Sequence, residues 1–280
     1  MQIMTEDRNS DGSYGSHLDM ICQVFDFVCF IVAGNWYGFC FCQVMANLPR
    51  YALIDDGSTF HVTWQCHNQD WLLKYDWAKQ KYYDLLLRFK DRYKIEIYSW
   101  TFMSNHPHLT GRCQDKKLFS DFFRLVNSCF ARTYNKRVGR KGQVVMDRFK
   151  SPRIETDVDL LKVMHYIDLN AKRAGIVAHP RDYKWSSYRY YAYGENDPLL
   201  TPASSYLDLG GTDEERMASY REMVEEILKN DWKEKRSYSS APFIGNPDWV
   251  FEKTRELRRI IAEKRLKPRL DTGPPSLSSP

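Results

Sequence analysis

The chain has 280 residues, of which 43% are hydrophobic and 15% aromatic, and its net charge is +5. This length and composition exclude a wholly disordered chain and allow one large domain or two small ones. The seven cysteines include no Cys-x-x-Cys pair. A zinc ribbon or a redox motif of that type is therefore unsupported, and we expect reduced thiols and a cytoplasmic location.

The first 44 residues differ from the rest, because they hold four of the seven cysteines. Residues 20–44 are apolar enough to consider a membrane span, but Asp26 and several amides interrupt them, and charges at mid-membrane are costly. The preceding residues are acidic, whereas a signal peptide begins with a basic region. The residues that begin at Met45 are typical of an ordinary protein N-terminus that leads into a first strand. We therefore predict that residues 1–44 are a non-native upstream extension or a disordered apolar segment, and we expect no membrane partner.

The remaining elements follow from hydrophobic periodicity, which is two for strands and 3.6 for helices. In chain order we predict a strand over 60–66, a helix over 77–93, a strand over 94–103, a helix over 118–134, a turn over 139–142, an extended segment over 147–155, a helix from Thr156 to before Gly175, and helices over 213–236 and 248–266. This order predicts an α+β fold: a small antiparallel sheet with helices on one face.

Two of the seven histidines, His106 and His108, lie one residue apart after the second predicted strand. If the strand continues through them, both rings point to the same face. The alternative is a turn at residues 104–105 into a third short strand. Such a pair taken alone is more often structural than functional. Two imidazoles with one oxygen ligand can nevertheless hold a divalent cation and leave coordination positions open.

The helix that Thr156 begins carries Tyr166 and Asn170, and a spacing of four places both on one helical face. Core packing is the default role of a tyrosine. A phenol, with a pKa near 10, is also a better leaving group than an alcohol. A phosphotyrosine bond can therefore form and be reversed by a DNA hydroxyl without ATP.

Residues 116–153 lie between the histidine pair and this helix and contain eleven Lys or Arg against two Asp. A local excess of +9 is expected for a surface that binds a polyanion, usually nucleic acid. The alternative is a solvated helix face.

Several ordered segments between residues 46 and 192 resemble the IS200-like single-tyrosine transposases of the HUH class, most closely the REP-associated tyrosine transposases. These segments are FHVTWQCHNQDWLL (60–73), FMSNHPHL (102–109), NKRVGRKGQVVMDRFKS (135–151), HYIDLNAKRAGIV (165–177) and WSSYRYY (185–191). The resemblance implies a ferredoxin-like catalytic domain of the HUH type over 45–195. A helical C-terminal extension over 196–266, a candidate DNA contact, and a disordered tail over 267–280 would follow it.

The implied activity is metal-dependent cleavage and rejoining of single-stranded DNA through a 5′-phosphotyrosine at Tyr166. The resemblance assigns Mg²⁺ or Mn²⁺ to His106 and His108, with Asn170 as a third ligand. The implied substrate is palindromic hairpin DNA of the REP type, bound by a nucleoid-associated monomer or homodimer. The candidate DNA-binding residues are Lys136, Arg137, Arg140, Lys141, Arg148, Lys150 and Arg173.

Two alternatives remain open. The chain could be a domesticated protein that binds hairpins without cutting them, or a metal phosphodiesterase that uses water and forms no covalent adduct.

Three residues depart from the family pattern. Pro107 cannot donate to a sheet ladder. Asp168 brings a carboxylate that either points away from DNA or repels it, and Ala171 replaces a usual proline.

Overall fold

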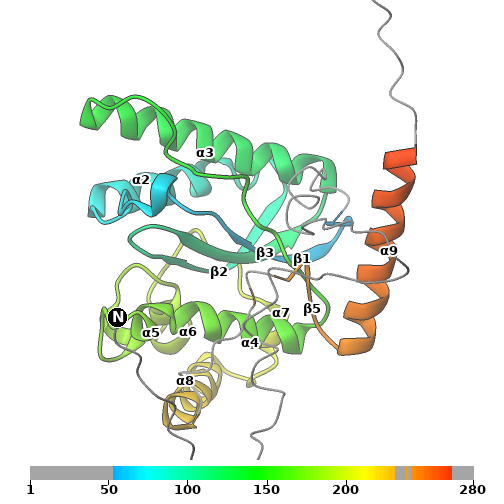
Figure 1. Ribbon diagram of the computed structural model, residues 1–280. Coiled ribbons are helices and arrows are strands. Elements are labelled where there is room, and N and C mark those ends of the chain that lie inside the picture. The colour runs from blue at the N-terminus through cyan, green and yellow to red at the C-terminus, as the bar shows by residue number, and fades with distance from the viewer. Residues whose placement is uncertain (1–52, 231–237, 239–240, 267–280) are drawn as a thin grey trace, which may run out of the picture. The chain divides into compact units, whose positions relative to one another are not determined.

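The computed structural model describes residues 53–230, 238 and 241–266 (Figure 1). Our predictions for residues 1–44 and for the tail over 267–280 lie outside these residues. Within the described part of the chain, no helix is long and apolar enough to cross a membrane.

A five-stranded sheet organises the fold, with the order β2-β3-β1-β4-β5. Its strands are β1 (Ser58–Thr63), β2 (Ile95–Phe102), β3 (Pro107–Cys113), β4 (Arg153–Ile154) and β5 (Phe243–Ile244). The pairs β1–β3, β2–β3 and β1–β4 are antiparallel, whereas β4 and β5 run parallel. The sheet is therefore mixed, and one edge strand comes from the C-terminal extension, for which we had predicted helices alone.

The helices lie on both faces of this sheet. They are α2 (Asp76–Phe89), α3 (Lys116–Val138), α4 (Asp157–Asp168), α5 (Asn170–Arg173), α6 (Tyr188–Tyr193), α7 (Ser204–Leu207), α8 (Asp213–Asn230) and α9 (Pro247–Leu266), with short 3-10 turns at His67–Gln69 and Pro180–Asp182. Figure 1 shows α2 and α3 on one face and α4 on the other. The α+β class is confirmed, but the helices are not confined to the one face that we expected.

The face under α2 and α3 is an aromatic core. Phe60 on β1 is fully buried, and its ring centroid lies 4.9 Å from that of Phe119 and 5.9 Å from that of Phe123. Trp64 donates from Nε1 to the hydroxyl of Tyr82 on α2 at 2.7 Å. Burying an aromatic or large aliphatic side chain contributes about 1.5–3 kcal/mol, so this face supplies much of the driving force for folding.

The opposite face carries polar side chains beneath α4. Ser99 and Thr110 share a hydroxyl hydrogen bond of 2.7 Å, and Thr101 donates to the carbonyl of Ile167 on α4 at 3.0 Å. Strand alternation places His108 on this face with Thr110, and the β1–β3 register pairs His61 with Thr110. The same polar face therefore anchors α4 and presents the histidines to it.

The turn between β2 and β3 explains how Pro107 is tolerated. Pro107 is the first residue of β3, a position at which the missing N–H removes little from the ladder. The N–H of Met103 donates to the carbonyl of His106 at 2.9 Å and closes the turn. Of our two expectations, the separate third strand is the one observed.

Thr156 caps α4 as predicted, because its hydroxyl accepts from the backbone N–H of Asp159 at 3.1 Å. The single helix that we predicted through Asn170 is interrupted, however. Leu169, with φ −83° and ψ −3°, leaves the usual helical ψ and separates α4 from α5. Tyr166 and Asn170 lie in different helices, so the spacing of four no longer decides where both side chains point.

Candidate active site

His106 and His108 come together at the start of β3, and their ring centroids are 4.8 Å apart at an interplanar angle of 81°. His108 is only 3% exposed. Burial lowers the pKa of His106 to about 4 and lowers the pKa of His108 well below its ordinary value. Both imidazoles are therefore neutral near pH 7, which is the form that ligates metal ions.

Tyr166 on α4 lies beside the histidine pair. Its ring centroid is 5.9 Å from that of His108, with the two rings nearly perpendicular. The packing of α4 across β2 and β3 makes this approach possible. Two residues that are 58 positions apart in the sequence thus lie side by side in the fold.

Arg173 on α5 contacts the same tyrosine. Its guanidinium carbon lies 4.6 Å from the Tyr166 ring centroid, and Nη1 donates to the Tyr166 carbonyl at 2.6 Å. We had predicted a DNA-binding role for Arg173. The structure places it against the ring of Tyr166.

Asn170, the predicted third ligand, is the first residue of α5. No hydrogen bond or ring contact between described residues joins it to His106 or His108. Its Nδ2 is buried and has no hydrogen-bond partner. A half-turn of the amide would put the carbonyl oxygen, an acceptor, at that buried position.

The donors in this site suit a divalent cation. Among the described residues, no hydrogen-bond partner is found for Nε2 of His106 or His108. The side-chain amide of Asn170 is buried at Nδ2, which has no hydrogen-bond partner among the described residues. Two neutral imidazoles and an amide oxygen are donor types that can bind a divalent cation. The described residues contain no group of three or more His, Cys, Asp or Glu that could hold a metal ion, so any such ion would depend on the pair and on oxygens from elsewhere.

Sequence reasoning missed three residues of this site: His61, Asn105 and Tyr238. His61 is fully buried and hydrogen-bonds His108, while the Tyr238 ring lies 5.1 Å from that of Tyr166. The alternation in FHVTW does place His61 on the polar side of its strand, but only the strand pairing reveals its neighbour. No local signal marks Tyr238, which is 72 positions beyond Tyr166.

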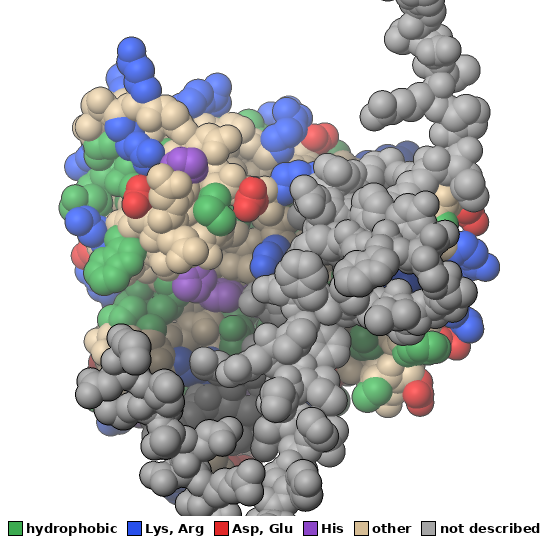
Figure 2. All heavy atoms as spheres, viewed as in Figure 1, with side chains coloured by type: hydrophobic (Ala, Val, Ile, Leu, Met, Phe, Trp, Pro, Cys, Tyr) green, Lys and Arg blue, Asp and Glu red, His purple; other side chains and the backbone are tan. Residues whose placement is uncertain are grey.

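The predicted DNA-binding residues of the basic segment lie mostly on the surface, and Lys150 is close to the site. Lys136, Arg137, Lys141, Arg148 and Lys150 are exposed, and Arg140 is half-buried. The segment runs along β1, where Thr63 pairs with Lys150 on one side and with His108 on the other. Figure 2 shows Lys and Arg side chains over α3 on the same face as histidine side chains.

Asp168 points away from the site. It is fully buried, and its carboxylate accepts from the Tyr220 hydroxyl at 2.7 Å and from the Ser187 hydroxyl at 3.1 Å. Burial raises its pKa to about 7. Of the two outcomes expected from sequence, repulsion of DNA is wrong, because the group lies in the interior.

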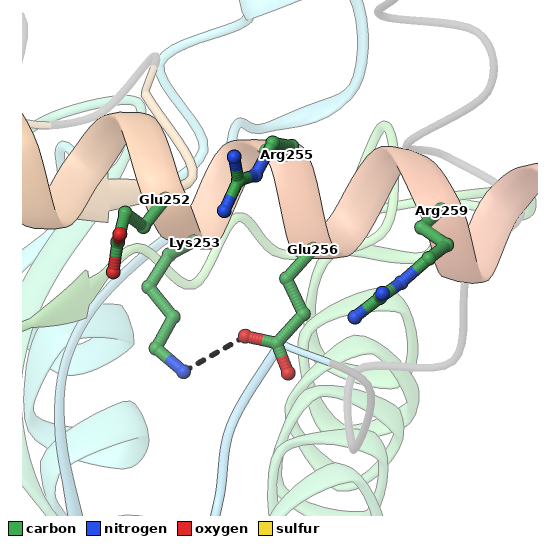
Figure 3. Close-up of a pocket in the computed structure, with 5 residues that line it drawn as sticks. All are labelled: Glu252, Lys253, Arg255, Glu256 and Arg259. Carbon is green, nitrogen blue, oxygen red and sulfur yellow. Dashed lines mark hydrogen bonds and ion pairs between the residues drawn. The ribbon is translucent and has the colours of Figure 1, made fainter.

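A cavity of about 310 Å³ lies along α9, and its described lining comes from Glu252, Lys253, Arg255, Glu256 and Arg259 (Figure 3). Lys253 and Glu256 form an ion pair of 2.8 Å. None of these side chains is a nucleophile or belongs to the histidine–tyrosine site. The cavity therefore marks a charged surface of the extension.

Part of the chain is similar to a known protein family. Residues 56–170 match the family model described as transposase IS200 like, a segment that includes His106, His108, Tyr166 and Asn170. One similar solved structure is that of a REP-associated tyrosine transposase bound to a REP hairpin. It is 20% identical and covers 53% of this chain and 87% of that one, with a TM-score of 0.42. No curated protein matches the chain. Residues 56–170 are thus similar to the IS200-like transposases.

Proposed function

We propose that this protein cleaves and rejoins single-stranded DNA through a covalent bond to Tyr166, and that palindromic hairpin DNA of the REP type is its substrate. The observation that carries the proposal is the convergence of His106, His108 and Tyr166 on the polar face of the sheet, with ring centroids 4.8 and 5.9 Å apart. The family match over residues 56–170 supports the same chemistry.

Each group has a defined part in the reaction. The Tyr166 hydroxyl oxygen forms a bond to phosphorus, the bond from phosphorus to the 3′ oxygen breaks, and that oxygen takes a proton to become a free 3′-OH. The 5′ phosphate stays on the tyrosine. Rejoining is the reverse step, in which a 3′-OH attacks and the tyrosine leaves.

The histidines would position the scissile phosphate by holding a divalent cation. Nε2 of His106 and of His108 would bind Mg²⁺ or Mn²⁺, with the amide oxygen of Asn170 as a candidate third ligand. Bound there, the cation would supply the Lewis acid that polarises the phosphodiester. Arg173 keeps a positive charge beside the Tyr166 ring, and this charge favours the attacking phenolate.

The basic segment contributes affinity for the DNA backbone. Its exposed cations are Lys136, Arg137, Lys141, Arg148 and Lys150, and Arg140 lies half-buried among them. Trp77 on α2 packs under the Arg137 guanidinium at 4.5 Å, which fixes one of these cations above an aromatic ring. Phosphate contacts position the strand and make the affinity depend on salt.

A covalent-adduct assay tests the proposal. Labelled single-stranded hairpin DNA, taken from palindromes flanking the gene, is incubated with the protein and Mn²⁺ and resolved on a denaturing gel. We expect protein-linked DNA with the wild type and none with Tyr166→Phe or with EDTA, while hairpin binding by Tyr166→Phe persists.

Two other outcomes would contradict the proposal in different ways. Tight hairpin binding without an adduct in either protein indicates a domesticated hairpin-binding protein. Cleavage that persists in Tyr166→Phe indicates a phosphodiesterase that activates water.

A further inference from the structure

A buried row of hydrogen bonds begins at a backbone carbonyl and ends at His108. The carbonyl oxygen of Tyr238 lies 2.8 Å from Nδ1 of His61. Nε2 of the same imidazole lies 2.9 Å from Nδ1 of His108. The rings of His61 and His108 are 5.1 Å apart and tilted by only 20°, so the two nitrogens face each other nearly in the plane of both rings.

The positions of the protons along this row follow from the donors and acceptors. A carbonyl oxygen can only accept, so Nδ1 of His61 carries the proton. A neutral imidazole has one donor and one acceptor, so Nε2 of His61 accepts. The proton shared with His108 therefore resides on Nδ1 of His108, and the lone pair of His108 is left on Nε2.

A second arrangement of the same kind orients His106. Its Nδ1 lies 2.6 Å from Oδ1 of Asn105. The amide of Asn105 is itself oriented, because Nδ2 donates to the carbonyl of Gln69 at 3.5 Å. The amide oxygen thus faces His106, accepts the Nδ1 proton and leaves the lone pair of His106 on Nε2.

We infer that His61 and Asn105 are positioning residues which hold His108 and His106 in the tautomer whose Nε2 can bind a divalent cation. His61 is not itself a ligand in this arrangement, because both of its nitrogens are engaged. The inference rests on the metal-binding role proposed above for His106 and His108. The inference also gives the C-terminal segment a role, because the carbonyl of Tyr238 holds the proton on Nδ1 of His61.

Partners of this kind matter because a ligating imidazole needs its other nitrogen fixed. An acceptor at Nδ1 sets the tautomer and the ring orientation, and its loss typically costs 10–100-fold in metal affinity. His61 meets this need from a neighbouring strand, 47 residues away in sequence. Asn105 meets it from the adjacent position in the chain.

The first test reads the tautomers directly in the wild-type full-length protein without metal. Long-range ¹H–¹⁵N NMR of histidine-labelled protein, assigned with single His→Gln variants, distinguishes a protonated Nδ1 from a protonated Nε2. We expect His61, His106 and His108 all to carry the proton on Nδ1. A proton on Nε2 of His108 would overturn the inference for His61, and one on Nε2 of His106 would overturn it for Asn105.

The second test measures Mn²⁺ affinity of full-length variants by electron paramagnetic resonance of the free ion. His61→Leu removes the acceptor and should weaken binding roughly 10–100-fold. His61→Gln can still accept through Oε1 and should bind close to the wild type. For His106, Asn105→Leu removes the acceptor and should weaken binding by the same factor. Asn105→Asp keeps an acceptor oxygen and should not weaken it. His179→Gln is the matched control, because His179 pairs with Glu225 outside the site.

The outcomes separate this inference from the proposed function. Wild-type Mn²⁺ affinity in His61→Leu, at an unchanged melting temperature, would refute the role of His61. If His61→Leu fails to fold, the NMR result on the wild type decides. Unchanged Mn²⁺ affinity in His106→Ala and His108→Ala would instead refute the metal site. Absence of a DNA adduct with the tautomers as expected would refute only the cleavage chemistry.

Discussion

Within the described part of the chain, Tyr166 lies beside three aromatic rings and the Arg173 guanidinium, and these neighbours distinguish it from an ordinary core tyrosine. The ring centroids of His108, His61 and Tyr238 lie 5.9, 6.3 and 5.1 Å from its own. The Arg173 guanidinium, 4.6 Å away, is the cation. In the proposed reaction, the Arg173 guanidinium is the positive charge beside the attacking tyrosine. The neighbouring His61 and His108 are neutral near pH 7, because burial lowers the pKa of both.

Arg173 provides a residue-scale prediction, because two roles have been assigned to it. If Arg173 acts on Tyr166, Arg173→Gln should lower the cleavage rate at saturating hairpin at least about tenfold and leave the affinity and its salt dependence unchanged. A backbone contact predicts the reverse: weaker binding, a salt slope reduced by about one and an unchanged rate at saturation. Single-turnover kinetics and binding titrations at several salt concentrations measure both quantities.

Lys141→Gln is the matched control for this measurement. Lys141 is exposed, and no ion pair between described residues includes it. It should show the pattern of a backbone contact, with a salt slope reduced by about one and normal chemistry at saturation. If both variants behave alike, Arg173 has no special relation to the tyrosine.

At the scale of elements, Asp168 joins the end of α4 to the C-terminal part of the protein. Its carboxylate accepts from Ser187, which precedes α6, and from Tyr220 on α8. The Tyr220 ring also packs 4.7 Å from that of His165, the neighbour of Tyr166. The helix that carries Tyr166 is thus also contacted by α8 of the extension.

The raised pKa of Asp168 makes a pH-dependent contribution to stability. Its pKa is about 7 in the folded protein against 3.8 ordinarily, so the folded state binds the proton more tightly. The contribution of this proton to the free energy of unfolding is fully present below about pH 4 and is lost as the pH rises to about 7. The loss is roughly 4 kcal/mol, because the pKa differs by about three units. Asp168→Asn should remove this loss.

Urea unfolding of the wild type and of Asp168→Asn at pH 5 and at pH 8 measures the effect. The difference between the two proteins cancels the titration of all other groups. We expect the variant to gain stability relative to the wild type between pH 5 and pH 8. A difference that does not change with pH would show that the buried carboxylate titrates normally.

Gly111 provides a second element-scale prediction, because β2 and β3 approach each other closely at that point. A Cβ on Gly111 would lie 2.0 Å from the carbonyl oxygen of Glu96 and 2.9 Å from Cζ of Phe60. Neither the strand backbone nor the buried ring can move freely. Gly111→Ala should therefore destabilise the protein by at least about 1–3 kcal/mol, the range for overpacking in a core.

Gly211→Ala is the control for thermal unfolding of Gly111→Ala. Its added Cβ would meet only the flexible Glu215 carboxylate, at 3.3 Å, so its melting temperature should stay near that of the wild type. Equal melting temperatures for both variants would show that the strands can separate at Gly111 without cost.

At the scale of the whole molecule, the C-terminal extension is part of the fold and also a candidate DNA contact. β5 continues the sheet beside β4, and α9 buries Leu257 and Ile261. Its exposed side carries Arg255 and Arg259, which line the cavity of Figure 3. Packing and DNA binding can therefore be tested on different sides of one helix.

We expect Arg255→Ala with Arg259→Ala to weaken hairpin binding and to reduce the salt slope by about two, while adduct formation at saturating DNA persists. Glu252→Gln, which removes a negative charge from the same surface, should change affinity in the opposite direction. Unchanged affinity in both variants would show that α9 serves packing alone.

Local patterns in the sequence determined much of this protein. The 3.6-residue period placed α2 and α3, and five apolar residues at this spacing in α3 are all fully buried: Phe119, Phe122, Phe123, Val126 and Phe130. The Thr156 cap, which the structure confirms, was likewise evident. Each of these signals operates within a few residues, so the sequence alone can show it.

Only the tertiary structure decided the contacts that complete the site. The hydrogen bonds of His61 join residues 47 and 177 positions apart, and Asp168 meets Tyr220 across 52 positions. The sequence predicted neither the parallel strand β5 nor the position of Arg173 against Tyr166. Such contacts depend on strand pairing and helix packing, which bring distant residues together without leaving a periodic pattern in the chain.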